Sequence, residues 1–260
     1  MTRPPTKLLA PGPFQAQQLR SGDPYELSNG HPILCLPTGG RGARANLLGG
    51  TVLETDPAVE QAGVDAGFSP EPGTMRALDV AVGNVPDVPG WVQGAPPLAV
   101  EYADRGQDEE ELQAKIAELL AAGTQHVWVV WLTGPRRVEV YAPGQKVRSV
   151  RPGESLEAPG ILKNPVPVEA LYDREAAHEV TLRNLLQRRG YESLEAVREA
   201  GREAGELAHA RAVLRRQLGK RGISLDAAQE ARIDGTTDLE TLDRWLEQTL
   251  VAKTADEALR

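Results

Sequence analysis

The sequence lacks several features that would assign it to a class at once. A single cysteine, Cys35, excludes a disulfide framework and a zinc site built from several cysteines. No stretch approaches the roughly 20 apolar residues of a membrane helix, and the N-terminal "MTRPPTKLLAPGPFQ" lacks the apolar run of a signal peptide. We therefore expect a cytoplasmic protein without a membrane partner.

An excess of basic residues is also missing. The chain has 29 Lys and Arg against 37 Asp and Glu, which gives a formal net charge of -8. This balance argues against a surface devoted as a whole to nucleic acid, but it leaves room for a local basic patch. The composition, 40% hydrophobic and 25% charged, is that of an ordinary soluble protein, and 260 residues are enough to bury a real core.

The chain divides into three parts by its sequence pattern. Residues 1–22 are rich in proline and glycine and are typical of an N-terminal arm. Residues 23–172 mix strand and helix patterns, whereas residues 173–260 are helical in propensity and almost free of strand patterns. The predicted fold is α/β, with a mixed sheet flanked by helices and a C-terminal helical extension.

Within residues 23–172 the pattern predicts a hairpin, a crossover and a second hairpin. Asn29-Gly30 suits a tight turn between two strands over 25–36, and a glycine-rich loop then leads into a short helix. Residues 51–75 are irregular, with proline and glycine between possible short strands. A strand at 97–102, a helix over about 108–122 and a strand at 126–132 form a crossover with parallel strands, and a hairpin follows over 136–153.

Two carboxylates interrupt strands that are otherwise apolar. Asp79 lies in the middle of "RALDVAV", and Glu101 ends "LAVEY". A buried carboxylate is costly unless it is paired, hydrogen-bonded or bound to a metal. Two carboxylates on adjacent strands would suit Mg²⁺, and Lys115 on the following helix could orient a water molecule beside a phosphate. The alternative is that Glu101 lies at the rim of the sheet and that Lys115 is a solvated helix residue.

The order of these elements resembles the Uma-two family of restriction endonucleases, within the PD-(D/E)xK nuclease superfamily. The resemblance rests on "YEL-NG-H", "LDVAV", "LAVEY", the helix with its lysine and "AGTQHVWVV", and it covers about residues 25–172. It implies a restriction-endonuclease-like α/β domain in which Asp79 and Glu101 bind Mg²⁺ or Mn²⁺. It also implies that Asp79, Glu101 and Lys115 are catalytic, because Lys115 matches a lysine displaced onto the helix.

The sequence departs from the family pattern at several positions. Leu78 replaces a proline, and Ala103 stands two positions after Glu101, so a literal E-x-K is absent. The chain has Arg41-Gly42-Ala43 where many relatives have a histidine, and Trp131 replaces an aspartate that often follows the central strand. The last two changes leave open an altered or lost activity.

Other residues have weaker claims to a role. Glu26 is either an accessory acid near the metal or a surface strand residue. Arg41 and Arg44 are candidates for contact with a nucleic-acid backbone. Arg211 and Arg215 share one helix face, and they either contact phosphate or belong to a solvated or intersubunit surface.

The family resemblance, together with the carboxylates and the lysine, implies a Mg²⁺-dependent endonuclease that hydrolyses phosphodiester bonds of nucleic acid, with DNA as the expected substrate. A homodimer or higher homo-oligomer would form through the helical tail, where Leu239, Leu242, Leu246 and Leu250 make an apolar stripe. The alternative is a non-catalytic assembly or binding module that retains the nuclease fold and oligomerises through its tail. The acidic balance, the "REAGREAG" repeat and the missing histidine favour this alternative.

Overall fold

A computed structural model describes residues 12–104 and 108–260 of the chain. By their contacts the residues form two compact units, Met1–Gly190 and Tyr191–Arg260. The part of the expected N-terminal arm that covers residues 1–11 lies outside the described residues. No helix in the described ranges is long and apolar enough to cross a membrane.

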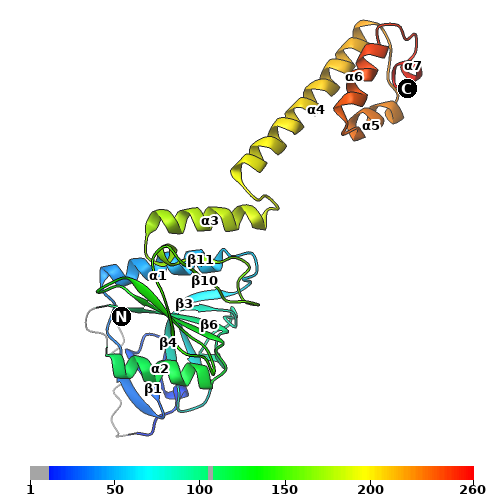
Figure 1. Ribbon diagram of the computed structural model, residues 1–260. Coiled ribbons are helices and arrows are strands. Elements are labelled where there is room, and N and C mark those ends of the chain that lie inside the picture. The colour runs from blue at the N-terminus through cyan, green and yellow to red at the C-terminus, as the bar shows by residue number, and fades with distance from the viewer. Residues whose placement is uncertain (1–11, 105–107) are drawn as a thin grey trace. The chain divides into compact units, whose positions relative to one another are not determined.

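The first unit is built around a seven-stranded mixed sheet (Figure 1). Its strand order is β5-β3-β4-β6-β7-β8-β9. The predicted crossover is confirmed. Strands β6 and β7, which precede and follow helix α2 in the chain, pair with each other in parallel. The strands are β3 (Ala62–Ser69), β4 (Arg76–Val82), β5 (Val92–Gln93), β6 (Leu98–Ala103), β7 (His126–Trp131), β8 (Arg137–Tyr141) and β9 (Arg148–Val150).

Helices cover both faces of this sheet (Figure 1). Helices α1 (Gly40–Glu54) and α3 (Arg174–Arg188) pack on one face, and α2 (Glu109–Ala121) packs on the other. Both faces of β6 are therefore buried, which explains its nearly continuous apolar sequence. Leu98, Val100 and Tyr102 belong to the core under α1 and α3, whereas the alternate residues face α2.

The predicted boundaries of α2 agree with the observed caps. The side chain of Asp108 accepts hydrogen bonds from the backbone N–H groups of Glu110 and Glu111, as an N-cap residue does. At the other end Gly123 has φ of 107°, a conformation that glycine adopts without strain. These caps fix the register of α2, and so they determine which of its side chains face the sheet.

The N-terminal hairpin is also present. Strands β1 (Tyr25–Ser28) and β2 (His31–Leu34) pair antiparallel, and Asn29 and Gly30 both have positive φ at the turn. Residues before it pack as well: the short 3-10 helix η1 (Ala16–Gln18) lies in a small core with buried Phe14 and Leu19. This part of the expected arm is therefore folded against the domain.

Two segments differ from the expected pattern. The glycine-rich stretch was expected to be a loop before a short helix, but it forms most of α1. This helix begins at Gly40 and runs for 15 residues. The irregular region contains the eight-residue strand β3, which pairs with both β4 and β5. A Cβ at Gly67 would lie 2.7 Å from the ring of Trp91, so this glycine is required by packing and not by a turn.

The end of the first unit is formed by short elements and α3. Strands β10 (Ser155–Leu156) and β11 (Val166–Pro167) pair with each other, and the 3-10 helix η2 (Val168–Leu171) leads to α3. Arg188 of α3 donates hydrogen bonds to the carbonyl groups of Glu54, Thr55, Asp56 and Val59. By these contacts α3, which the sequence pattern assigned to the tail, belongs to the first unit.

The second unit is helical, with a core of its own. It comprises α4 (Leu194–Lys220), α5 (Ala227–Gly235), α6 (Leu239–Gln248) and α7 (Ala255–Ala258). Leu214 and Leu218 of α4 pack with Leu242 and Trp245 of α6. The inner part of the leucine stripe therefore has a partner within the tail, whereas Leu250 is 64% exposed.

Candidate active site

Asp79 lies where two neighbouring strands stop pairing. Strand β4 pairs with β6 only from Val80 to Val82. Next to this ladder, Asp79 Oδ2 accepts a hydrogen bond from the backbone N–H of Tyr102 at 2.7 Å, and Oδ1 accepts one from Asn46 Nδ2 at 2.8 Å. The carboxylate thus takes the place of a backbone acceptor between the diverging strands.

Glu101 is buried on β6 and pairs with Lys115 of α2. Its Oε2 accepts a hydrogen bond from Lys115 Nζ at 2.9 Å, and only 7% of the residue is exposed. Its Oε1 is buried and has no hydrogen-bond partner among the described residues. Glu101 is therefore not at the rim of the sheet, and Lys115 is not a solvated helix residue.

Lys115 is held at the site by three acceptors. Besides Glu101, Nζ donates to the backbone oxygen of Ala77 at 2.5 Å and to Glu26 Oε1 at 3.4 Å. Position 103 on β6 is a buried alanine that packs against α2. The lysine that is missing from β6 is thus supplied from α2, at the face of that helix that meets the sheet.

Burial and the neighbouring charges together raise the pKa of both members of the Glu101–Lys115 pair. Burial raises the pKa of Glu101 to about 8, while Lys115 opposes the shift and Asp79 and Glu26 add to it. Burial by itself lowers the pKa of Lys115, but Glu101, Glu26 and Asp79 together outweigh it, so the pKa is raised. Lys115 is consequently an ammonium group at neutral pH, beside a carboxyl group that exchanges its proton in the weakly alkaline range.

Arg76 extends the cluster, and the sequence analysis did not identify it. This arginine opens β4, is 1% exposed, and forms ion pairs with Glu26 at 3.2 Å and with Glu111 and Glu118 at 2.6 Å each. Glu26 therefore bridges Arg76 and Lys115. A signal was present in the sequence: Glu111, Lys115 and Glu118 recur at helical spacing and share one face of α2.

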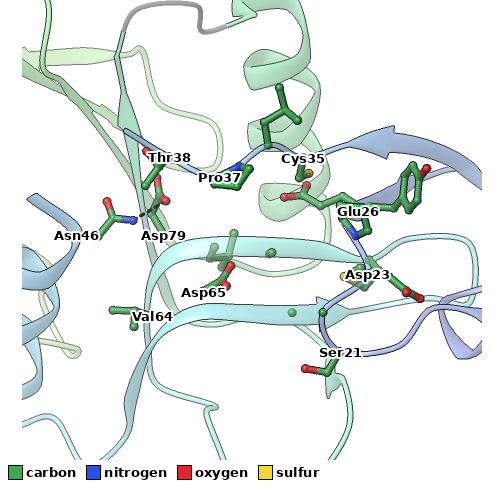
Figure 2. A pocket seen from close by; sticks show the side chains of 18 of the residues that line it. Ser21, Asp23, Glu26, Cys35, Pro37, Thr38, Asn46, Val64, Asp65 and Asp79 are labelled. Atoms are coloured by element: carbon green, nitrogen blue, oxygen red, sulfur yellow. Dashed lines mark hydrogen bonds between the residues drawn. The ribbon is translucent and has the colours of Figure 1, made fainter. Parts of the chain in front are cut away.

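The cluster borders a cleft of about 690 Å³. Figure 2 shows Asn46 and Asp79 on one side of it, with Glu26 and Cys35 further along. Asp79, Glu26 and Lys115 all contribute to the lining. Burial raises the pKa of the Cys35 thiol to about 11, so this cysteine stays protonated and is not a nucleophile at neutral pH.

The donor atoms of the site fit a hard divalent cation. Mg²⁺ binds through one or two carboxylates and keeps several waters. Asp79 and the unpartnered Oε1 of Glu101 provide such oxygens. Among the described residues, no group of three or more His, Cys, Asp or Glu is arranged to hold a metal.

The four arginines expected at a nucleic-acid surface are spread over both units. Arg41 Nε donates to Asp104 Oδ2 at 2.8 Å, and Arg44 is exposed on α1. In the tail, Arg211 donates to the carbonyl of Thr236, and Arg215 pairs with Glu230 and Asp234. The tail pair is thus engaged within its own unit, and contact of these arginines with nucleic acid stays a prediction.

The sheet is open and mixed, has helices on both faces, and carries a carboxylate pair and a lysine where two central strands part. These features define a nuclease-like α/β protein. The Uma2 family, described as "Putative restriction endonuclease", matches residues 13–166. The chain belongs to this family, as the resemblance of its motifs predicted.

A solved structure supports the same fold. The chain is similar to the crystal structure of a putative nuclease belonging to DUF820 from Anabaena variabilis, with a TM-score of 0.52 and 18% sequence identity. The similarity covers 64% of this chain and 99% of that one. No curated protein matches the sequence. The family is thus one described as a restriction endonuclease family, and the fold is shared with a structure described as a putative nuclease.

Proposed function

We propose that this protein is a Mg²⁺- or Mn²⁺-dependent endonuclease that hydrolyses phosphodiester bonds of nucleic acid, with DNA as the substrate. The observation that carries the proposal is the buried Lys115–Glu101 pair beside Asp79, at the edge of a cleft. Burying an ammonium group and two acidic side chains in one place is costly, and the raised pKa of Glu101 reflects that cost. A bound cation would pair with the acidic side chains, and a phosphate would pair with the ammonium group.

Each residue has a separate task in this proposal. Asp79 and Glu101 would hold the metal, which when bound polarises the scissile phosphate and lowers the pKa of a coordinated water. Lys115 would orient that water and stabilise the negative charge that develops on the phosphate. Glu26 would keep Lys115 in place through its contact with Nζ, which makes it a positioning residue.

Further parts of the proposal concern location and assembly. We expect the protein to act in the cytoplasm and to form a homodimer or higher homo-oligomer. Cleavage of both strands of a duplex is most simply done by a two-fold dimer. Exposed Leu250 and Val251, at 64% and 81%, are candidates for contact between copies at the end of the tail.

A paired measurement of cleavage and metal binding tests the function. Wild-type protein is incubated with plasmid and with single-stranded DNA in Mg²⁺ or Mn²⁺, and ion binding is followed by calorimetry. Lys115→Ala should lower the cleavage rate by about 10²–10³, because one preorganised donor is lost. It should keep or strengthen metal binding, because it leaves Asp79 and Glu101 with less positive charge nearby. Lys115→Arg should not restore full activity, because a planar guanidinium does not replace a compact ammonium group.

The matched control is Lys146→Ala, which removes an exposed lysine. If Lys115→Ala cuts as fast as the control, Lys115 has no catalytic role. If the wild type binds no divalent ion and cuts nothing, the protein is the non-catalytic assembly module, and Lys115 only neutralises buried carboxylates.

A further inference from the structure

Asn46 lies beside Asp79, although no pattern in the sequence marked it as part of the site. It comes from the second turn of α1, and its Nδ2 donates to Asp79 Oδ1 at 2.8 Å. Figure 2 shows the two side chains facing each other at one end of the cleft. This hydrogen bond fixes the orientation of both groups.

The other end of the Asn46 amide has no partner within residues 12–104 and 108–260. Its Oδ1 is buried, yet it accepts no hydrogen bond from that part of the chain. The reverse amide orientation would set this oxygen against the Asp79 carboxylate, which has no proton to share when ionised. The lack of a donor therefore belongs to the site and does not result from a choice of rotamer.

A second acceptor with the same property lies in this cluster. Glu101 Oε1 is also buried and has no partner in the described part of the chain, and the residue is only 7% exposed. A buried acceptor without a donor typically costs about 1–3 kcal/mol. Lys115 does not satisfy Asn46 Oδ1, because its bonds go to Ala77, Glu101 and Glu26. Asn46 Oδ1 beside Asp79, and Glu101 Oε1 within reach of the Asp79 charge, are thus buried oxygens that accept no hydrogen bond from the described residues.

We propose that Asn46 is the third protein ligand of the divalent ion: its Oδ1 binds the cation while its Nδ2 orients Asp79. An amide oxygen is a hard ligand suited to Mg²⁺ or Mn²⁺, and it completes the site without adding charge. This inference rests on the proposed function, because it requires the ion at Asp79 and Glu101.

Calorimetric titration of the full chain with MnCl₂ and with MgCl₂ tests the inference without relying on cleavage. Asn46→Ala should weaken ion binding by about 10-fold or more, in the range seen when a group that supports a metal site is removed. Asn46→Asp should bind the ion more tightly than the wild type, because the ligand oxygen is kept and gains charge. Addition of the ion should also raise the melting temperature of Asn46→Asp more than that of the wild type.

The two variants separate ligation from mere orientation. If Asn46 only orients Asp79 through Nδ2, then Asn46→Asp loses that donor and binds the ion more weakly. Leu47→Asp is the matched control, because it adds a carboxylate one position later, at a residue that is 68% exposed. Equal strengthening by Leu47→Asp would mean that only long-range charge acts and would overturn the inference.

Two further results would also overturn it. Unchanged affinity in Asn46→Ala, while the wild type binds the ion, would reject Asn46 as a ligand and leave the proposed function standing. A wild type that binds no divalent ion would reject both the ligand and the proposed function.

Discussion

At the scale of single residues, Glu101 decides how the stability of the metal-free protein depends on pH. Its pKa is raised to about 8 by burial, compared with an ordinary value of 4.5 in the unfolded chain. Between these values the unfolded state has lost the proton that the folded state keeps. The free energy of unfolding should therefore fall as pH rises from about 4.5 to 8, and it should level off above 8.

Glu101→Gln removes this dependence, because an amide does not titrate. In metal-free buffer we expect the variant to gain stability over the wild type as pH rises, by a few kcal/mol at most, on the scale of about 1.4 kcal/mol per pKa unit. Urea unfolding at pH 5, 6.5 and 8.5 measures the difference. Glu157→Gln, at an exposed position, is the control and should show none. A constant difference across pH would mean that Glu101 is ionised throughout.

The sequence predicted some of these residues and not others, for a physical reason. Asp79 and Glu101 were recognisable because charged residues are rare inside apolar strands. Lys115 was placed by family resemblance, and the structure brings it to Glu101. Asn46 carried no such mark, because a polar residue is ordinary on a helix. Arg76 was indicated only indirectly, by its glutamate partners on one face of α2, and the tertiary contacts reveal that both residues lie at the cluster.

At the scale of elements, Arg76 joins strands β1 and β4 to helix α2 through its three glutamate partners. Arg76→Leu would leave Glu26 buried without its arginine, and it would leave the charges of Glu111 and Glu118 without the arginine that they share with Glu26. Removing one partner of a buried ion pair typically costs about 3–5 kcal/mol. We expect a loss of that order in the free energy of unfolding, measured in urea.

Arg148→Leu, at an exposed position on β9, is the comparison and should change little. A variant with Arg76→Leu that is as stable as the wild type would show that the glutamates are protonated or solvated without the arginine. In that case the network would not support α2, and Lys115 would be positioned by Glu101 and Ala77 alone.

The elements themselves were predicted to different degrees. The hairpin at Asn29-Gly30, strands β4, β6 and β7 and helix α2 follow from local rules, namely turn chemistry, apolar runs and caps. Strand β3 did not, because it contains Gly63, Gly67 and Asp65, the last with φ of 54°. Its strand structure comes from pairing with neighbours on both sides, which single-sequence propensity does not contain.

At the scale of the whole molecule, the chain is a nuclease-like unit followed by a helical unit with its own core. The sequence pattern changes near residue 172, where the last strands end. The contacts place the division after Gly190, because α3 buries Ala177 and Val180 in the main core. A helical sequence pattern marks where strands stop, but not which core a helix joins.

This difference leads to a prediction about truncation. A chain that ends at residue 190 should fold with nearly the thermal stability of the first unit in the full protein, because it keeps α3 over α1. A chain that ends at residue 172 should be strongly destabilised, because it exposes the core under α3 and removes the four hydrogen bonds of Arg188. Circular dichroism melting of both chains measures this. Equal melting temperatures would place the domain boundary at 172.

Light scattering on the 190-residue chain, compared with the full protein, then tests the tail. A smaller number of subunits per particle is expected if the tail joins copies, and an unchanged number would assign the assembly contacts to the first unit.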